Sequence, residues 1–318
     1  MKEFYKLFKE NKKIALLPHE NIDGDALCSC FALFELAKAA GSSADIIVED
    51  EIPSNLLFLG GEYLNMSEEL SLDYDCAIAV DCGDEKRLGT RRPVFESARV
   101  TGVLDHHMTN KGFGNKALIL PDASSSCEII FDLFLSNGVK LSKRAATCIL
   151  SGILTDTGGF RYSNTTEKTL LTAARLFALG IDTAYLCHEL LETVTLSRAK
   201  LQNAALDKAK FLHGGRTAIT YVSEEMLREY SATEDDTANL STMLRNIMGV
   251  KTSVSIRRHG GAFKVSMRTD GTKSAAGICA KFGGGGHERA AGFTSYETDI
   301  DKLTDMILEE IGGYERDN

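Results

Sequence analysis

The sequence lacks tryptophan, has only four prolines, and contains no apolar run long enough to cross a bilayer. The first two scarcities exclude no fold, whereas the third excludes a membrane-spanning helix. The N-terminal segment is charged and amphipathic, without the apolar core or cleavage pattern of a signal peptide. We therefore expect a cytoplasmic protein that does not act at a membrane.

The chain also has fewer positive than negative side chains. It contains 36 lysines and arginines and 45 aspartates and glutamates, which gives a net charge of −9. A protein that grips long DNA usually presents a basic face, so extended duplex is not an expected substrate. A small anionic substrate stays compatible with this charge, since bound metal ions would invert the local field. The 318 residues suffice for two domains, and the 43% hydrophobic and 25% charged fractions are ordinary for a soluble protein.

The eight cysteines do not follow the spacing of a zinc site. Cys28, Cys30 and Cys82 lie beside acidic residues, so thiolate ligation of a metal is an alternative, but not the favoured one. The others that we singled out lie in apolar runs, as small core residues would: Cys76, Cys127, Cys148 and Cys279.

The first half of the chain alternates strand-like and helix-like segments. Such alternation predicts an α/β domain with a parallel, Rossmann-like sheet covered by helices on both faces. Ligands bind such sheets at the carboxyl ends of the strands. The predicted strands are residues 12–19, 44–49, 76–81, 99–105 and 117–121, and the predicted helices are residues 25–40, 124–137 and 141–153.

The second half predicts a smaller α/β domain after a helical connection. Residues 166–180 resemble a helix, and residues 181 to about 212 a further helical stretch that links two domains. The predicted domain boundaries are 1–185, 186–213 and 214–318. In the last range we expect strands at 217–222, 251–258 and 262–269, and helices at 273–282 and 299–311.

Acidic residues and histidines gather at the ends of the predicted apolar segments. Because parallel strands bring their carboxyl ends to one edge, residues far apart in sequence can converge there. Carboxylate and imidazole ligands suit a pair of hard divalent metals in a phosphoryl-transfer enzyme. The clusters are His19 with Asp23 and Asp25, then Asp81, then Asp105-His106-His107, and finally Asp156.

Each carboxylate also has a simpler interpretation. Asp23 or Asp25 could merely cap a helix, and Asp81 could form a turn. Asp156, between two threonines, could cap or ligate. The convergence of four clusters favours metal binding.

Two adjacent histidines cannot both face one side of a strand. One of His106 and His107 could ligate a metal while the other meets a substrate oxyanion. Asp105 could accept a ring N–H and so set the tautomer of a histidine.

Four glycines, Gly283 to Gly286, precede His287 and are too specific for a spacer. Such a loop lets backbone amides approach a phosphate, and the N-terminus of a following helix would attract anions. A flexible hinge is the alternative. Arg268, at a predicted strand end, could give a bidentate phosphate contact or simply be solvated, whereas residues 257–259 are better explained as a solvated edge.

These motifs resemble those of the DHH phosphoesterase superfamily. The first is His19-x-Asn21-x-Asp23-Gly24-Asp25-Ala26, followed by Asp81, Asp105-His106-His107 and Thr155-Asp156-Thr157. Gly283 to His287, with Ala290-Ala291-Gly292-Phe293, resembles the signature of the DHH-associated C-terminal domain. The layout is similar to the stand-alone bacterial oligoribonuclease (nanoRNase) and pAp phosphatase branch. Departures from the family pattern, at Ile22, Cys28 and Thr269, remove no ligand.

The resemblance implies two divalent ions, Mn²⁺ or alternatively Mg²⁺, in the first domain. It assigns His19, Asp23 and Asp81 to one ion, and Asp25, Asp81, His106 and Asp156 to the other, with Asp81 bridging. Asp105, His106 and His107 are the implied catalytic residues: His107 faces the phosphate and Asp105 supports a histidine. The second domain would close over a cleft, with Arg268, Gly284, Gly285, Gly286 and His287 holding the substrate.

We therefore predict a phosphoesterase that hydrolyses short single-stranded RNA to mononucleotides, and also pAp, by two-metal activation of water. Cleavage of cyclic di-AMP or pApA is the close alternative. A long-substrate exonuclease, a manganese pyrophosphatase and a non-catalytic nucleotide sensor are less favoured. The resemblance alone suggests a homodimer.

Overall fold

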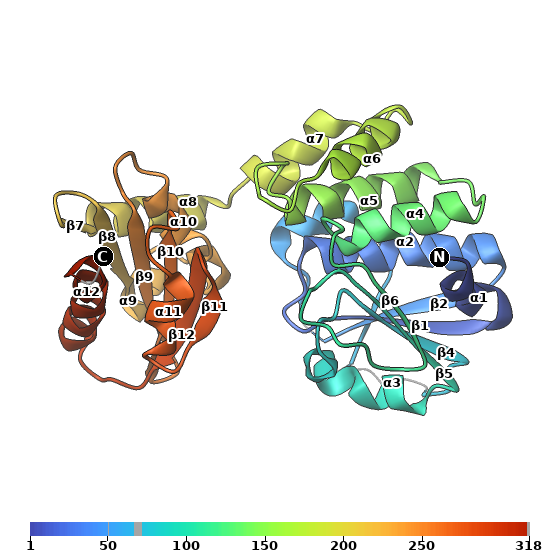
Figure 1. The fold of residues 1–318 in the computed structure, drawn as a ribbon, viewed down its shortest axis with the longest axis horizontal. Coiled ribbons are helices and arrows are strands. Elements are labelled where there is room, and N and C mark those ends of the chain that lie inside the picture. Colours follow the sequence, from blue (N-terminus) through green and yellow to red (C-terminus); the bar gives the residue numbers. More distant parts are fainter. Residues whose placement is uncertain (50, 67–71, 317–318) are drawn as a thin grey trace. The chain divides into compact units, whose positions relative to one another are not determined.

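The computed structural model describes residues 1–49, 51–66 and 72–316. The chain forms two compact units, Met1–Thr193 and Val194–Asn318 (Figure 1). Within the described residues, no helix combines the length and the apolar character needed to cross a membrane.

The first unit is built on a parallel sheet in the order β3-β2-β1-β4-β5-β6. The chain turns from one half of the sheet to the other between the neighbouring strands β1 and β4, which is where such folds bind ligands. In the described part of the chain its strands are β1 (Lys13–Pro18), β2 (Ser43–Val48), β3 (Leu64–Asn65), β4 (Cys76–Val80), β5 (Val100–Asp105) and β6 (Lys116–Ile119).

Both faces of this sheet are covered, which accounts for its uniformly apolar strands. In β1, Ile14 and Leu16 enter a core formed with α1, α2, α4 and α5, whereas Ala15 and Leu17 pack toward α3. Figure 1 shows α2, α4 and α5 on one side of the strands and α3 on the other. The helical elements are α1 (Lys2–Glu10), α2 (Gly24–Ala40), η1 (Ser54–Leu59), η2 (Glu85–Arg91), α3 (Arg92–Ser97), α4 (Ser126–Ser136), α5 (Lys143–Asp156), α6 (Glu167–Phe177), α7 (Thr183–Cys187) and η3 (His188–Glu192).

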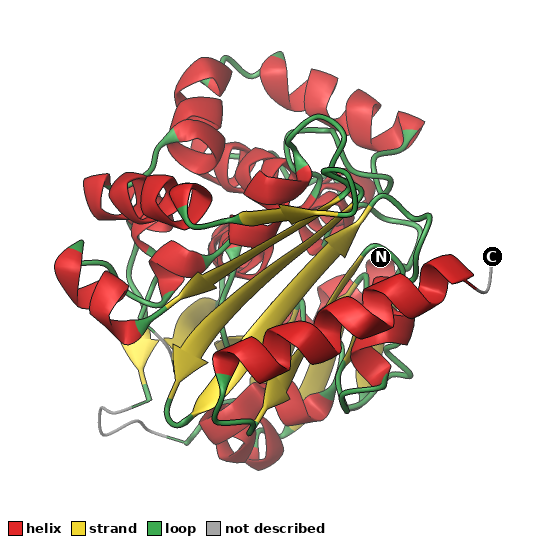
Figure 2. Ribbon diagram, turned by 90° about the vertical axis from the view of Figure 1, so that its left-hand side faces the viewer, coloured by secondary structure: helices red, strands yellow, loops and turns green. Residues whose placement is uncertain are grey.

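The second unit holds a mixed sheet in the order β11-β12-β10-β9-β8-β7, in which only β8 and β9 pair in parallel. One face packs on α11 and α12 through residues such as Leu303 and Ile307, and Figure 2 shows the long helix α12 lying across the strands. The elements are α8 (Leu196–Asp207), β7 (Lys210–Leu212), β8 (Thr217–Val222), α9 (Glu224–Glu229), η4 (Asp235–Thr237), α10 (Leu240–Arg245), β9 (Thr252–His259), β10 (Ala262–Thr269), α11 (Ala275–Ala280), β11 (Gly285–His287), β12 (Ala290–Ser295) and α12 (Ile300–Arg316).

The predicted α/β class, with a parallel sheet in the first half and a smaller α/β domain in the second, is confirmed. Two local expectations were wrong. Residues 181–212 are not one helical stretch: Thr195 caps a new helix, α8, and Lys210–Leu212 pairs with β8 as a strand. The glycine-rich segment is followed by β12 rather than by a helix, because Gly285–His287 pairs with it as β11.

All eight cysteines are free thiols in the structure. Seven are buried, and Cys187, in α7, is partly exposed. Burial raises the pKa of Cys82 to about 12 and that of Cys76 to about 12. Burial also raises the pKa of Cys28 and of Cys30 well above the usual range. Burial therefore favours the protonated form of the thiols beside the acidic clusters.

Candidate metal centre and substrate site

The first unit gathers the predicted metal ligands at the carboxyl edge of its sheet. They lie after β1, after β4, after β5 and at the end of α5. Three groups have ligand atoms within 4.8 Å of one another. These groups are His19-Asp23-Asp81, Asp25-His106-Asp156 and Asp81-His106-His107.

Asp81 lies between the two sides of the cluster. Its Oδ2 is 3.6 Å from His19 Nε2, and its Oδ1 is 3.5 Å from His106 Nε2. His19 Nε2 is also 3.5 Å from Asp23 Oδ2, and His106 Nε2 is 3.5 Å from Asp156 Oδ2. Each oxygen of Asp81 thus faces a different group, the arrangement that a carboxylate shared by two ions requires.

The histidines of these two groups have their Nδ1 atoms next to carbonyl oxygens. His19 Nδ1 lies 2.7 Å from the Glu20 oxygen, and His106 Nδ1 lies 3.3 Å from the Ala123 oxygen. A proton on His106 Nδ1 would donate to the Ala123 carbonyl and leave Nε2 with a lone pair aimed at the carboxylates. His19 Nδ1 also lies 2.9 Å from Arg87 Nη2, so this ring nitrogen faces both a carbonyl acceptor and a guanidinium donor. Carbonyl contacts of this kind commonly set the tautomer of a metal-binding histidine.

His107 has a different environment from His106. Its Nδ1 donates to Asp105 Oδ1 at 2.7 Å, while Asn110 Nδ2 donates to Asp105 Oδ2 at 2.7 Å. The Asp105 hydrogen bond, opposed by burial and aided by Asp81, raises the pKa of His107. Burial would raise the pKa of Asp105, but the hydrogen bonds from His107 and Asn110 outweigh it and lower that pKa. The raised pKa favours the protonated ring of His107, whose Nε2 could then donate to an anionic group.

The cluster carries more negative charge than its own histidines can balance. Burial and the charges of Asp81 and Asp156 raise the pKa of Asp25 well above its usual range. Burial, opposed in part by His106, together with the charges of Asp81 and Asp23, raises the pKa of Asp156 to about 6. Crowded carboxylates of this kind fit divalent cations, which would relieve their repulsion.

Glycine is needed where α5 approaches the cluster. A Cβ on Gly152 would lie 2.3 Å from Cys127 Sγ and 2.7 Å from Asp25 Oδ1. A Cβ on Gly24, between the first two aspartates, would lie 2.5 Å from Thr155 Cγ2. The absence of a side chain at these two glycines lets α2 and α5 approach closely, which brings Asp25 and Asp156 together.

Three polar side chains that support the cluster escaped the sequence analysis. Ser126 Oγ donates to Asp81 Oδ1 at 2.9 Å, and Asn110 holds Asp105. Asn164 Nδ2 donates to Asp156 oxygens at 3.1 and 3.4 Å. Of these three, only Ser126 lies in a pattern that could have drawn attention, because serines at the start of a helix often cap it. A helix cap does not reveal a tertiary partner.

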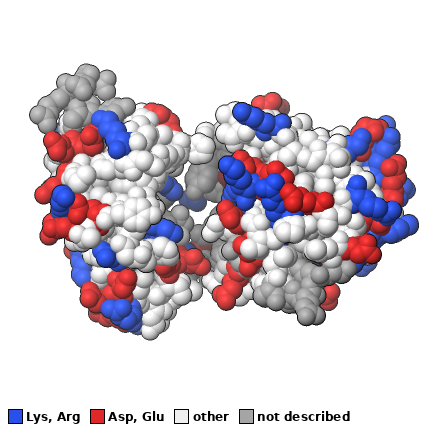
Figure 3. Space-filling view, turned by 90° about the horizontal axis from the view of Figure 1, so that it is seen from below, with Lys and Arg blue, Asp and Glu red and all other residues white. Residues whose placement is uncertain are grey.

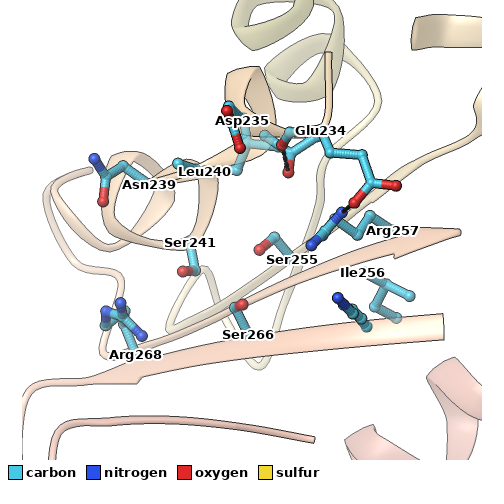
Figure 4. Close-up of a pocket in the computed structure, with 13 residues that line it drawn as sticks. Glu234, Asp235, Asn239, Leu240, Ser241, Ser255, Ile256, Arg257, Ser266 and Arg268 are labelled. Atoms are coloured by element: carbon cyan, nitrogen blue, oxygen red, sulfur yellow. Dashed lines mark hydrogen bonds and ion pairs between the residues drawn. The ribbon is translucent and has the colours of Figure 1, made fainter. Parts of the chain in front are cut away.

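The expected substrate-binding residues other than His107 lie in the second unit. Arg268 pairs with Ala290 in the sheet, and Ala290 pairs with His287, so Arg268 and His287 stand in one row and point to the same face. Arg268 lines a pocket of about 200 Å³ over β9 and β10. Figure 4 shows Arg268 near one end of this pocket, together with Asn239 and Ser241. Arg257 and Glu234 lie near its other end.

The predicted glycine loop is tied to β12 by close backbone contacts. A Cβ on Gly284 would lie 2.3 Å from the Gly292 oxygen, and one on Gly286 would lie 2.5 Å from the Ala290 oxygen. Gly285 has open space at its Cβ position. Glycine is therefore required for sheet packing at positions 284 and 286. At Gly285 the backbone is accessible.

Known families match both units. Residues 13–153 match the N-terminal domain of the DHH family, and residues 214–313 match the DHHA1 domain. A Thermus thermophilus protein named bifunctional oligoribonuclease and PAP phosphatase NrnA is 32% identical over 94% of this chain and 89% of its own length. The chain belongs to the DHH family.

Two further proteins resemble the chain over nearly its whole length. A solved exopolyphosphatase-related protein from Bacteroides fragilis superposes with a TM-score of 0.90 at 25% identity, covering 98% of this chain and 95% of that one. The cyclic-di-AMP phosphodiesterase GdpP of Geobacillus thermodenitrificans is 26% identical over 97% of this chain but only 48% of its own length.

Proposed function

We propose that the chain is a metal-dependent phosphoesterase that hydrolyses short RNA oligonucleotides to mononucleotides and pAp to AMP. The observation that carries this proposal is the cluster of seven carboxylate and imidazole side chains with Asp81 among them, in a chain similar along its length to NrnA. Two-metal centres of such ligands suit phosphoester hydrolysis.

Two divalent ions, Mn²⁺ in our proposal and Mg²⁺ as the alternative, would supply a nucleophilic water at neutral pH and neutralise charge on the phosphate. His19, Asp23 and Asp81 would hold one ion. Asp25, Asp81, His106 and Asp156 would hold the other. The opposite orientation of the two Asp81 oxygens supports this division.

The remaining groups act on the substrate. His107 would donate from Nε2 to a phosphate oxygen, while the hydrogen bond to Asp105 orients the ring and, by raising its pKa, favours its protonated form. Arg268, His287 and the backbone at Gly284, Gly285 and Gly286 would hold a terminal phosphate or nucleotide of the substrate. Arg268 and His287 share one sheet face, which supports a common ligand.

We further propose that the enzyme works in the cytoplasm, as a homodimer, on short single strands rather than on long duplex. On the face of the molecule that Figure 3 shows, basic and acidic side chains lie intermixed. Intermixed charge does not favour binding along an extended polyanion. Sedimentation of the purified chain would test the dimer, and competition by long duplex DNA would test the exclusion.

The first test is turnover of an RNA series from two nucleotides upward, of pAp and of cyclic di-AMP, each with Mn²⁺, with Mg²⁺ and with chelator. We expect metal-dependent release of mononucleotides, fastest from the shortest RNA. Preferential opening of cyclic di-AMP would replace this proposal with the GdpP-like activity, which a match to only 48% of the length of GdpP does not favour. No turnover with metal bound would point to a nucleotide sensor.

The matching variant is Asp81→Ala. It removes the shared carboxylate, so we expect turnover to fall by at least about a thousandfold, the scale of losing a central catalytic group. Asp84→Ala is the control, because Asp84 lies on the same loop but is exposed and caps η2 instead. If Asp81→Ala kept most of its activity, the metal centre would be wrongly assigned.

A further inference from the structure

We infer that four residues at the start of α4 (Ala123, Ser124, Ser126 and Cys127), here called the α4 entry segment, position the ligands of one of the two ions and that Ser126 is its central positioning residue. The inference rests on the metal centre of the proposed function, and it concerns how this chain holds the centre in shape. Ser126 is fully buried, so its contacts are with protein groups.

Ser126 contacts two of the carboxylates at once. Its Oγ donates to Asp81 Oδ1 at 2.9 Å, and its backbone N–H donates to Asp25 Oδ2 at 2.6 Å. The next amide, that of Cys127, donates to Asp25 Oδ1 at 3.0 Å. Both oxygens of Asp25 are thereby held by the first turn of α4, where N–H groups have no partner within the helix.

The same segment reaches the other two ligands of this group. The Ala123 carbonyl lies 3.3 Å from His106 Nδ1. Asn164 Nδ2 donates to the Ser124 oxygen at 2.9 Å and lies 3.4 Å from Asp156 Oδ2. Asp25, Asp81, His106 and Asp156 therefore all contact the α4 entry segment, directly or through one amide.

The ligands of the other ion have separate supports. His19 Nδ1 faces the Glu20 carbonyl, and Asp23 Oδ1 accepts from the Ala26 N–H at 3.0 Å. Asp81 belongs to both groups, but Ser126 holds its Oδ1, whereas Oδ2 faces His19. Loss of the Ser126 hydroxyl should therefore disturb mainly the position formed by Asp25, His106 and Asp156.

The physical role of the hydroxyl is to hold a carboxylate in place before the ion arrives. Asp25 and Asp81 are buried and repel each other, so each would otherwise turn away from its neighbour. Groups that orient metal ligands in this way typically change metal affinity by about 10–100-fold when they are removed. The effect needs no contact between Ser126 and the ion.

The test is calorimetric titration of Mn²⁺ into the full chain after removal of metal by chelator. Three variants separate positioning from helix stability. Ser126→Ala removes the hydroxyl, and Ser126→Thr keeps one. Ser125→Ala removes the cap of α4, because Ser125 Oγ accepts from the Glu128 N–H at 3.1 Å, and within the described residues Ser125 makes no hydrogen bond with a ligand carboxylate.

We expect Ser126→Ala to lower the affinity for one of the two Mn²⁺ ions by about 10–100-fold and to change the affinity for the other by less than about threefold. Ser126→Thr should bind both ions within about threefold of the wild type. Ser125→Ala should lower the melting temperature and leave both affinities unchanged.

The inference would be overturned if Ser126→Ala bound both Mn²⁺ ions as the wild type does, or if it lost affinity for both ions equally. It would also be overturned if Ser125→Ala lost as much Mn²⁺ affinity as Ser126→Ala. If the wild-type chain bound no divalent ion, the proposed function itself would fail. Because the readout is ion binding rather than turnover, the two failures are distinguishable.

Discussion

At the scale of single residues, the carboxylates around Asp81 are stabilised by positive charge, which either a proton on a histidine or a metal ion can supply. Burial disfavours a charged His19, yet attraction to Asp23 and Asp81 outweighs burial and raises the pKa of His19 to about 10. The ring is therefore protonated at neutral pH when no metal is bound. An ion that uses His19 Nε2 must displace this proton.

Metal affinity should therefore rise with pH. Below about pH 10 the metal-free protein holds a proton on His19 that the metal-bound protein lacks, so apparent affinity should increase about tenfold per pH unit for each displaced proton. Protons on Asp25 and on part of Asp156 would act in the same direction. We expect calorimetry between pH 6 and 8, in buffers of different ionisation enthalpy, to show release of at least one proton. Affinity independent of pH would contradict this charge assignment.

The residue types of the site were predictable from sequence, but their supports were not. A histidine or carboxylate after an apolar strand indicates a ligand, because burial of an unpaired charge is costly. Ser126, Asn110 and Asn164 carry no such signature, since serine and asparagine are common at caps and turns. Their partners lie up to 101 positions away in the chain, as Ser126 and Asp25 do.

At the scale of elements, the strands were more predictable than the connections. Central parallel strands such as β1 and β4 are buried on both faces and therefore read as short apolar runs. The strands β3, β7 and β11 were missed because each has two or three residues, too few for a period to show. The six-residue strand β12 was also missed, because its alanines and glycine have low strand propensity. β11 also contains two glycines, which weaken any strand signal.

Element packing makes a prediction for α5. Gly152→Ala would place a methyl group against Cys127 and Asp25, at 2.3 and 2.7 Å. Overpacking of this kind costs about 1–3 kcal/mol, and displacement of Asp25 should also weaken Mn²⁺ binding. Urea denaturation with and without Mn²⁺ would measure both effects.

Gly312→Ala in α12 is the matched control, because its Cβ position has no atom within 4 Å. Alanine favours a helix over glycine by about 1 kcal/mol, so this variant should be neutral or slightly more stable. A Gly152→Ala protein as stable as the wild type, with normal Mn²⁺ binding, would argue against tight packing of α5 at Asp25.

At the scale of the whole molecule, the proposed functions are divided between the units. The candidate ion ligands belong to Met1–Thr193, and Arg268, His287 and the glycine segment belong to Val194–Asn318. Binding of ions and binding of substrate should therefore be separable by mutation. The two-part α/β architecture followed from patterning, since helix and strand periods change character after residue 213.

His287→Ala should raise KM for short RNA by about tenfold, as expected for loss of one charge-assisted contact to a phosphate. Its Mn²⁺ affinity should remain within about twofold of the wild type. Steady-state kinetics and calorimetry on the same preparation would compare the two. His188→Ala, an exposed position that pairs with Glu192 in the first unit, should change neither.

Equal losses of metal and substrate binding in His287→Ala would instead mean that the ring supports the ion centre, and the division of labour would be wrong.

The distribution of thiols makes the protein convenient for fluorescence. Of eight cysteines, only Cys187 is partly exposed, and it lies six positions before the end of the first unit at Thr193. A maleimide dye should therefore attach at one place in the unmodified chain. Since burial raises the pKa of Cys187, coupling should be faster at mildly alkaline pH. With an acceptor on a nucleotide, energy transfer would report each substrate as it arrives and leaves.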